Sequence, residues 1–344
     1  MADNADIFKQ LLGKVAGGDT LSADESARAF DIMMSGDATA AQMGGLLLAL
    51  HTRGETVEEI AGAATTMRAK AATIEAPPNA MDVVGTGGDR SGTYNISTCI
   101  AIVVAGCGVP VAKHGNRAAS SKSGAADVLG ALGIDIDADF ALLEKSVREA
   151  GICFMMAQRH HGAMRNVMPT RVELGTPTIF NILGPLSNPA GVKRLMVGTY
   201  AAKWVEPMAA TLGKLGAERA WVVHGKDGLD ELTTTGPSLV CEYHEGELRQ
   251  FELSPEEAGL PLAKAENLKG GDPAHNAAAI RAVLSGEAGA YRDIVLYGAA
   301  AALKVAGRTD DLREGVAVAD EAIASGKALA ALDRMVEITN EGGA

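Results

Sequence analysis

The segment from residue 81 to residue 133 most constrains the fold of this chain. It contains two glycine- and serine-rich turns. Each turn follows a short β-branched run and precedes an apolar run typical of a helix. A loop that links a strand to a helix N-terminus presents backbone N–H groups to a phosphate. The segment therefore predicts an α/β unit that binds a phosphate group.

Strand-like and helix-like patterns alternate from residue 81 onward, after a proline-containing break at residues 76–79. Short strands are predicted at residues 81–84, 109–113, 152–156, 194–200 and 219–224, with helices at about 97–107, 123–133, 139–150 and 203–216. This alternation predicts an α/β fold whose central, mostly parallel sheet is flanked by helices. A hairpin that turns at Glu245 and Gly246 is expected to project from the sheet, and residues 273–341 return to helix.

Residues 1–72 carry apolar side chains at three- and four-residue spacing, which predicts helices throughout this segment. Ser22 with Glu25, and Thr56 with Glu59, have the spacing of capping boxes at helix starts. The run LLLAL at residues 46–50 leaves more apolar surface than four short helices hide, so a partner surface is expected. Docking on the rest of the chain and contact with a second copy are equally compatible with this pattern.

Composition and charge exclude several classes of function. A net charge of −12 with 4% aromatic residues disfavours an extended nucleic-acid surface. The longest apolar run, CIAIVVAGC, is too short to span a bilayer, and the N-terminus lacks the pattern of a signal peptide. The four cysteines lie far apart, which favours reduced thiols over a disulfide or metal site. We therefore expect a cytoplasmic protein without nucleic-acid or membrane partners.

The first turn reads GTGGD from Gly85 to Asp89, after the strand MDVV and before a helix that starts at NIST, residues 95–98. Glycines let backbone N–H groups approach phosphate oxygens, and Ser97 and Thr98 add hydroxyls at a helix N-terminus. The pattern matches neither a Walker loop nor a dinucleotide fingerprint. Taken alone, the glycine cluster is also compatible with a simple turn.

The second turn, residues 113–122, holds three cations, an imidazole, an amide and two hydroxyls within ten residues. Burying them requires a counter-charge, which an anionic ligand would supply. A solvated basic loop is the alternative interpretation. Downstream, Asp230 and Glu231 follow the strand WVVHG, where paired carboxylates suit Mg²⁺, although an exposed acidic pair without a role would look the same.

A further polar stretch follows the strand ICFMMA. His160 and His161 lack partners at metal-ligand spacing, so a zinc site is not expected. Arg171 or Arg165 could form a bidentate pair with a carboxylate, and a helix-surface arginine remains the alternative.

A series of motifs can be read together, in the order GTGGD, NIST, KHGNRAASS, SGAADVLGALG, RVELG, TIFNILGPLSNP and GLDE. In this order they closely resemble the anthranilate phosphoribosyltransferase family, and the resemblance runs from the first helices to about residue 330. The resemblance implies an α-helical dimerisation domain at residues 1–75, joined by part of 160–185, and an α/β domain that binds phosphoribosyl pyrophosphate at 76–344. It also implies a homodimer. The implied reaction joins the amine of anthranilate to C1 of the ribose, releasing pyrophosphate and forming N-(5-phosphoribosyl)anthranilate.

The resemblance also assigns site residues. Contacts to phosphoribosyl pyrophosphate are expected from Gly85, Gly88, Asp89, Thr93, Asn95, Ile96, Ser97, Thr98, Lys113, His114, Gly115, Asn116, Arg117, Ala118, Ala119, Ser120, Ser121 and Ala125. Contacts to anthranilate are expected from Gly85, His114, Asn116, His161 and Arg171. Two Mg²⁺ ions are expected on Ser97, Asp230 and Glu231, and catalytic roles fall on Lys113, Asp230 and Glu231.

Two positions depart from the family pattern, because Pro177 stands where an arginine is common and Gly162 where proline or a small polar residue is usual. Altered substrate affinity or local stability is the expected consequence. Two other functions remain open on this sequence. A nucleoside phosphorylase of the same architecture would need no metal pair, and a non-catalytic sensor of phosphate ligands would lack the metal or substrate groups.

Overall fold

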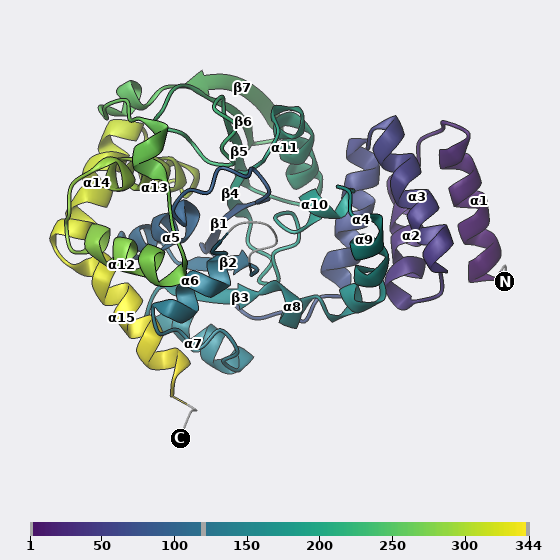
Figure 1. Cartoon of the computed structure of the whole chain (residues 1–344), viewed down its shortest axis with the longest axis horizontal. Coiled ribbons are helices and arrows are strands. Elements are labelled where there is room, and N and C mark those ends of the chain that lie inside the picture. Colours follow the sequence, from purple (N-terminus) through teal and green to yellow (C-terminus); the bar gives the residue numbers. More distant parts are fainter. Residues whose placement is uncertain (1–2, 118–121, 342–344) are drawn as a thin grey trace.

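The structure is a computed structural model that describes residues 3–117 and 122–341. Figure 1 shows a bundle of N-terminal helices beside a larger unit built around a sheet. Four candidate phosphate contacts, Ala118, Ala119, Ser120 and Ser121, lie outside the described residues.

Within the described residues, seven strands form one sheet in the order β3-β2-β1-β4-β5-β6-β7. Their bounds are β1 (Met81–Gly85), β2 (Val111–Gly115), β3 (Ile152–Met156), β4 (Arg194–Gly198), β5 (Arg219–Gly225), β6 (Ser238–His244) and β7 (Glu247–Leu253). The pairs from β3 to β5 are parallel, and the last two are antiparallel. The α/β fold with a mostly parallel sheet, as predicted, is confirmed.

The hairpin around Glu245 and Gly246 does not project from the sheet. β6 pairs with β5 at seven positions, and β7 pairs with β6, so the hairpin extends the sheet edge. The physical reason lies in β6, where Val240 and Cys241 are both fully buried and join the cores on opposite faces of the sheet. Such a strand has no solvated face and must lie within the sheet.

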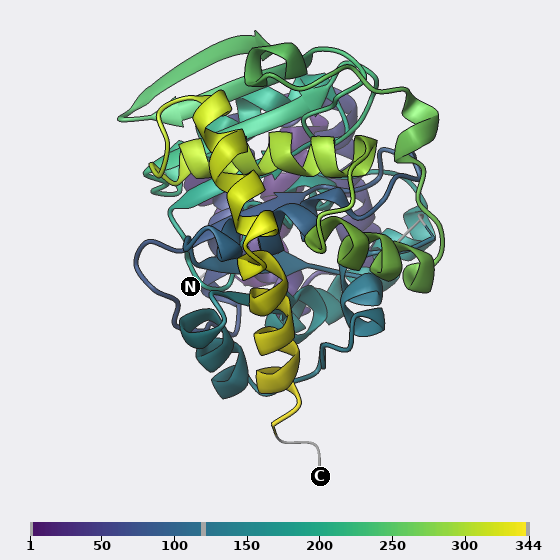
Figure 2. The same ribbon diagram turned by 90° about the vertical axis from the view of Figure 1, so that its left-hand side faces the viewer.

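Helices cover both faces of the sheet. On one face lie α5 (Ile96–Gly106), α13 (Ala290–Val305), α14 (Leu312–Ala324) and α15 (Lys327–Thr339), which Figure 2 shows from outside. Around its edges lie α6 (Ala125–Ala131), α7 (Phe140–Glu149) and α12 (Pro273–Leu284). The other face meets α11 (Val205–Lys214) and the short helices α8 (Ala157–His160) and α10 (Phe180–Leu183).

Helix α5 is the central helix of the first face, because its sequence is apolar all round and its residues from Thr98 to Val104 are buried. The partner helix α13 approaches it closely at Gly298, where a Cβ would lie 2.2 Å from Cδ1 of Ile100. This packing fixes the N-terminal end of α5 relative to the sheet. The candidate phosphate loop ends at that helix end.

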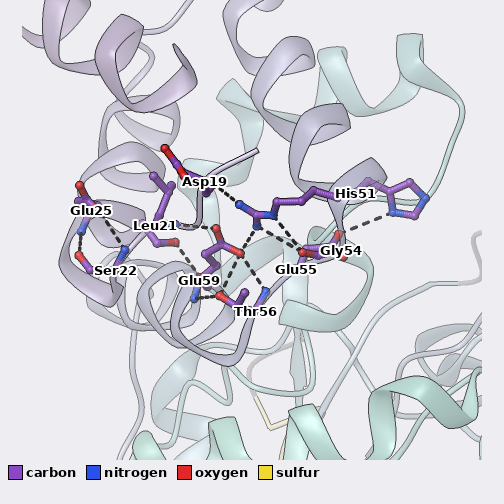
Figure 3. A network of polar contacts seen from close by, with 11 residues as sticks. Asp19, Leu21, Ser22, Glu25, His51, Gly54, Glu55, Thr56 and Glu59 are labelled. Carbon is purple, nitrogen blue, oxygen red and sulfur yellow. Dashed lines mark hydrogen bonds and ion pairs between the residues drawn. The ribbon is translucent and has the colours of Figure 1, made fainter. Parts of the chain in front are cut away.

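The helical bundle contains α1 (Asn4–Ala16), α2 (Ala23–Ser35), α3 (Ala40–Arg53) and α4 (Val57–Ala69). Both predicted capping boxes are present. Figure 3 shows that the buried Glu59 carboxylate does more than cap α4, since it also accepts the backbone N–H of Leu21 at 2.8 Å and pairs with Arg53. One side chain therefore joins the starts of α2 and α4.

A later segment packs on this bundle. It comprises the turn Gly162–Asn166 and α9 (Met168–Leu174). Asn166 donates its side-chain amide to the carbonyl of Met34 at 2.7 Å, and α9 lies against α3 in Figure 1. At Gly44 of α3, a Cβ would meet Leu174 at 3.7 Å, so α9 sits directly on this glycine. Among the described residues, no helix is both long enough and apolar enough to cross a membrane.

Candidate active site

The candidate site lies at the carboxyl ends of β1 and β4, where the strand order reverses. The chain first builds outward from β1 to β2 and β3 and then returns to place β4 on the other side of β1. Ligands of open α/β sheets bind at such a switch point. Two strand-end glycines, Gly85 and Gly198, lie beneath the loop that carries Asp230.

Both glycines are required by the close approach of that loop. A Cβ at Gly85 would lie 2.6 Å from Oδ2 of Asp230, and one at Gly198 would lie 1.6 Å from its carbonyl oxygen. The loop itself is held by Asp227, whose Oδ2 accepts the hydroxyls of Thr233 at 2.7 Å and Thr235 at 2.6 Å. Sequence reasoning missed Asp227, although the series of threonines after a loop aspartate is a recognisable sign of such a turn.

The first glycine turn reaches the acidic loop directly. Gly87 donates its backbone N–H to Oδ2 of Asp230 at 2.7 Å. Gly87 and Gly88 have φ of 65° and 80°, which only glycine adopts readily. The carboxylate of Asp89 holds the end of the turn by accepting the N–H of Ser91 at 3.1 Å.

The carboxylates of Asp89, Asp230 and Glu231 lie close to one another in the site. Burial and, second to it, the neighbouring Asp89 raise the pKa of Asp230 to about 7, while the N–H of Gly87 opposes the shift. Burial also raises the pKa of Glu231 well above its usual range, with Asp230 adding to the effect and Lys113 opposing it. Carboxylates that repel one another in this way are stabilised by a bound cation.

The oxygen atoms available as metal ligands fit Mg²⁺ better than a metal that is bound by protein side chains alone. Asp230 and Glu231 supply hard oxygens, and Ser97 lies close to Glu231 through its backbone N–H. Across the described residues, no group of three or more His, Cys, Asp or Glu side chains is arranged to hold a metal by itself. Mg²⁺ commonly binds through one or two carboxylates and completes its shell with water and substrate phosphate oxygens.

Lys113 on β2 is the buried cation of the site, with 2% of its surface exposed. Its Nζ donates to the carbonyl of Val83 at 2.5 Å and lies 3.4 Å from Oγ of Ser97. Burial lowers the pKa of the ammonium, while Asp82, Glu231 and Asp230 raise it. An ammonium held beside a helix N-terminus in this way is suited to a phosphate.

Ile96 and Asn95, at the start of α5, have different surroundings. Ile96 is buried in the apolar core, so only its backbone can face a ligand. The side chain of Asn95 is already engaged, since its Nδ2 donates to the carbonyl of Ser123 at 3.1 Å and its Oδ1 accepts from Asn276 at 2.9 Å. Asn95 therefore ties the two glycine- and serine-rich turns together. Sequence reasoning missed Asn276 because it lies 181 residues away.

Nearby, Thr93 pairs with Lys269 in an isolated β-bridge, which fastens the first turn to the segment before α12. In the second turn, Asn116 accepts the backbone N–H of Ala126 at 3.2 Å through its carbonyl. Arg117 pairs with Asp127 at 3.3 Å. Gly115 ends β2, where a Cβ would lie 2.8 Å from the Phe154 ring and 3.3 Å from Ala125, so this turn also requires a glycine.

On the side of the second turn, two imidazoles face each other. The ring centroids of His114 and His161 are 5.1 Å apart. Burial and, second to it, a neighbouring histidine lower the pKa of His161 to about 4, and the same two causes hold the pKa of His114 well below its usual value. Both rings are therefore neutral at pH 7.

Arg171 on α9 lies over the ring of Phe180, with its guanidinium carbon 5.4 Å from the ring centroid. Among the described residues, no carboxylate forms an ion pair with it, so its charge is available to a ligand. Arg165, the other candidate, is exposed. Pro177 and Gly162, the two departures from the family pattern, are also exposed.

Comparisons with known proteins identify the class to which this fold and site belong. The helical bundle domain of a glycosyl transferase family matches residues 9–71, and its a/b domain matches residues 77–329. Anthranilate phosphoribosyltransferases from Paramagnetospirillum magneticum and Rhodospirillum rubrum are 63% and 61% identical, each over 97% of this chain and 96% of the relative. The chain belongs to the anthranilate phosphoribosyltransferase family.

Solved structures of anthranilate phosphoribosyltransferases have the same fold as this chain. The enzyme from Thermus thermophilus superposes with a TM-score of 0.91 at 44% identity, covering 96% of this chain and 99% of the other. The Saccharomyces cerevisiae enzyme in complex with PRPP and Mg superposes with a TM-score of 0.89 at 29% identity, covering 97% of this chain and 98% of the other.

Proposed function

We propose that the residues gathered at the ends of β1, β2 and β5 carry out the reaction of this family. The phosphoribosyl group of phosphoribosyl pyrophosphate is transferred to the amine of anthranilate, and pyrophosphate leaves. The observation that carries the proposal is the meeting of three elements, since the Asp230 carboxylate, the Gly87 N–H and the Lys113 ammonium converge around the start of α5. The related yeast enzyme is known in complex with PRPP and Mg.

Phosphoribosyl pyrophosphate, the ribosyl donor, is assigned to the two turns that follow β1 and β2. The N–H groups of the glycine turn and the N-terminus of α5 would face phosphate oxygens, with the Ser97 and Thr98 hydroxyls beside them. Lys113 would stabilise the charge that develops on the departing pyrophosphate, and holding the reactants in place would supply much of the remaining rate. Asp230, Glu231 and Ser97 would hold two Mg²⁺ ions. Bound there, Mg²⁺ neutralises negative charge on the pyrophosphate.

The acceptor is assigned to the side of α9. Arg171 would pair with the anthranilate carboxylate, because it is partly buried and, among the described residues, its guanidinium has no carboxylate partner. The neutral rings of His114 and His161, together with Asn116, would position the aromatic ring. The bond from C1 of the ribose to pyrophosphate breaks in a dissociative, oxocarbenium-like displacement as the amine forms its new bond to C1, and the nitrogen then releases one proton to water. An aromatic amine is already neutral at pH 7, so no strong base is required.

The assembly is part of the proposal. We assign residues 1–75 and part of 160–185 to a dimerisation domain and residues 76–344 to the α/β domain that binds the donor. Support comes from the exposed apolar side chains of Leu48 on α3 and of Met168 and Val172 on α9, two helices in mutual contact. The unpaired thiols of the four cysteines accord with a cytoplasmic location.

One assay tests the function. The protein is mixed with anthranilate, phosphoribosyl pyrophosphate and Mg²⁺, and the loss of anthranilate fluorescence is followed. We expect rapid loss with the metal and none after chelation. Phosphorolysis of a nucleoside in place of this reaction would favour a nucleoside phosphorylase, and no turnover under either condition would favour a sensor.

A further inference from the structure

The sheet is interrupted directly beneath the candidate site. β1 and β2 pair at only one position, Met81 with Val111. By contrast, β1 pairs with β4, and β2 with β3, at five positions each. The two strands that deliver the two turns therefore separate after their first residues.

Side chains take over the backbone groups that a continued ladder would use. In a parallel ladder of this register, His114 N–H would bond to Val83 C=O, and Ala112 C=O would accept from Val83 N–H. Instead, His114 N–H donates to Oδ1 of Asp82 at 3.1 Å, and Val83 C=O accepts from Nζ of Lys113 at 2.5 Å. Nδ2 of Asn188 donates to Ala112 C=O at 2.9 Å.

The two groups that hold this gap open also bind each other. Nδ2 of Asn188 donates to Oδ2 of Asp82 at 2.7 Å, and both side chains are buried. Asn188 is itself oriented, because its Oδ1 accepts the N–H of Ala190 at 2.8 Å. A buried carboxylate is costly, and here burial raises the pKa of Asp82 to about 6 despite the nearby Lys113. Packing alone does not require a carboxylate here, since an apolar residue fills buried space without this cost.

We propose that Asp82 and Asn188 are positioning residues for the transfer reaction. By substituting for the β1–β2 ladder, they keep the ends of the two strands apart, and this sets the place of the Lys113 ammonium and of His114. The inference rests on the proposed roles of Lys113 and His114. Neither Asp82 nor Asn188 would touch a substrate, since both are buried and each is bonded to a backbone group of β2 and to the other.

The test compares Asn188→Ala and Asp82→Asn with a matched control. Asp82→Asn keeps the shape of the side chain but leaves it only one acceptor oxygen. Its new amide group must therefore face either the His114 N–H or the Asn188 amide, each of which is also a donor. Ser146→Ala is the control because Ser146 is fully buried and donates one hydrogen bond, to Ile152 C=O at 2.7 Å, at the far end of β3. For each variant, kcat and both KM values are measured well below its melting temperature, and amide hydrogen exchange is followed at His114.

We expect kcat to fall at least tenfold in Asn188→Ala and Asp82→Asn, with faster exchange at His114, while Ser146→Ala melts earlier but keeps kcat within twofold. Should Asn188→Ala not fold, Asp82→Asn and Asn188→Ser provide the same comparison. The inference is overturned if the folded variants keep kcat and KM within twofold of the wild type or change them only as the control does. Absence of turnover in the wild type would instead overturn the proposed function.

Discussion

Gly87 and Asp230, 143 residues apart in the chain, are joined by a backbone-to-carboxylate hydrogen bond of 2.7 Å. The bond connects the glycine turn after β1 with the acidic loop after β5. The bond therefore holds the glycine turn, on the side of the ribosyl donor, at a fixed place relative to the carboxylates on the metal side of the proposed site. This preorganisation lowers the entropy lost when the reactants are positioned.

The carboxylate pair can be tested by removing its charge. Asp230→Asn with Glu231→Gln should raise the Mg²⁺ concentration for half-maximal turnover at least tenfold and lower kcat by a factor of about 100, because the hard anionic donors are lost. Glu245→Gln, at the exposed turn of the β6–β7 hairpin, is the control and should change neither value. Wild-type turnover of the double variant at limiting Mg²⁺ would remove both residues from the metal site.

Arg171→Ala should raise the KM for anthranilate at least tenfold and that for the ribosyl donor much less. The reason is that a charged hydrogen bond to the substrate carboxylate is lost, which is worth about 1.5–3 kcal/mol. Steady-state kinetics with each substrate varied in turn supplies the measurement. Arg165→Ala, the exposed neighbour, should leave both constants unchanged. A larger effect on the donor than on anthranilate would rule out the assignment.

Gly198→Ala should displace the acidic loop, since the new Cβ would lie 1.6 Å from the carbonyl oxygen of Asp230. We expect a loss of about 1–3 kcal/mol of stability and a large fall in turnover. Gly130→Ala on α6 is the matched control, because a Cβ there meets no atom within 4 Å. It should be neutral or stabilising by up to about 1 kcal/mol. Equal behaviour of the two variants in thermal melting and turnover would contradict the packing described.

Asp82 should make stability depend on pH. Its folded pKa of about 6 lies above the ordinary 3.8 because of burial, with Lys113, Asn188 and the His114 N–H opposing the shift. A raised carboxyl pKa means that the folded state holds the proton more tightly, so the wild type loses stability as pH rises from about 4 to about 6. The loss is about 3 kcal/mol.

Asp82→Asn lacks this titration. Its free energy of unfolding relative to the wild type should therefore increase by about that amount between pH 4 and pH 7, as measured by urea unfolding at both values. The same difference at the two pH values would show that the carboxyl does not titrate in this range.

The proposed dimer predicts a surface effect. Val172→Glu on α9, where the wild-type side chain is 73% exposed, should convert the dimer to monomers by placing a charge in the apolar contact. Leu262→Glu introduces the same charge at a residue that is 57% exposed in the α/β unit, and the dimer should persist. Sedimentation velocity distinguishes the two states. A monomeric wild type, or dissociation by both variants, would contradict this interface.

Much of the fold was predictable, because strand and helix periods in the α/β unit are local signals. Val240 and Cys241 show the limit, since the alternating pattern of the hairpin does not reveal that both faces of β6 are covered. The glycine turn and the acidic pair could also be predicted, because each motif is contiguous. Asp82 could not, since one aspartate in an apolar strand acquires its role only through Asn188, 106 residues away.

The central claim is that this site joins two substrates in one metal-dependent displacement. Its most direct test is to count the products by mass spectrometry and a pyrophosphate assay in the presence of Mg²⁺. We predict one N-(5-phosphoribosyl)anthranilate and one pyrophosphate for each anthranilate consumed, and none of either after chelation. Pyrophosphate released at the same rate without anthranilate, or anthranilate left unchanged with Mg²⁺ present, would contradict the account.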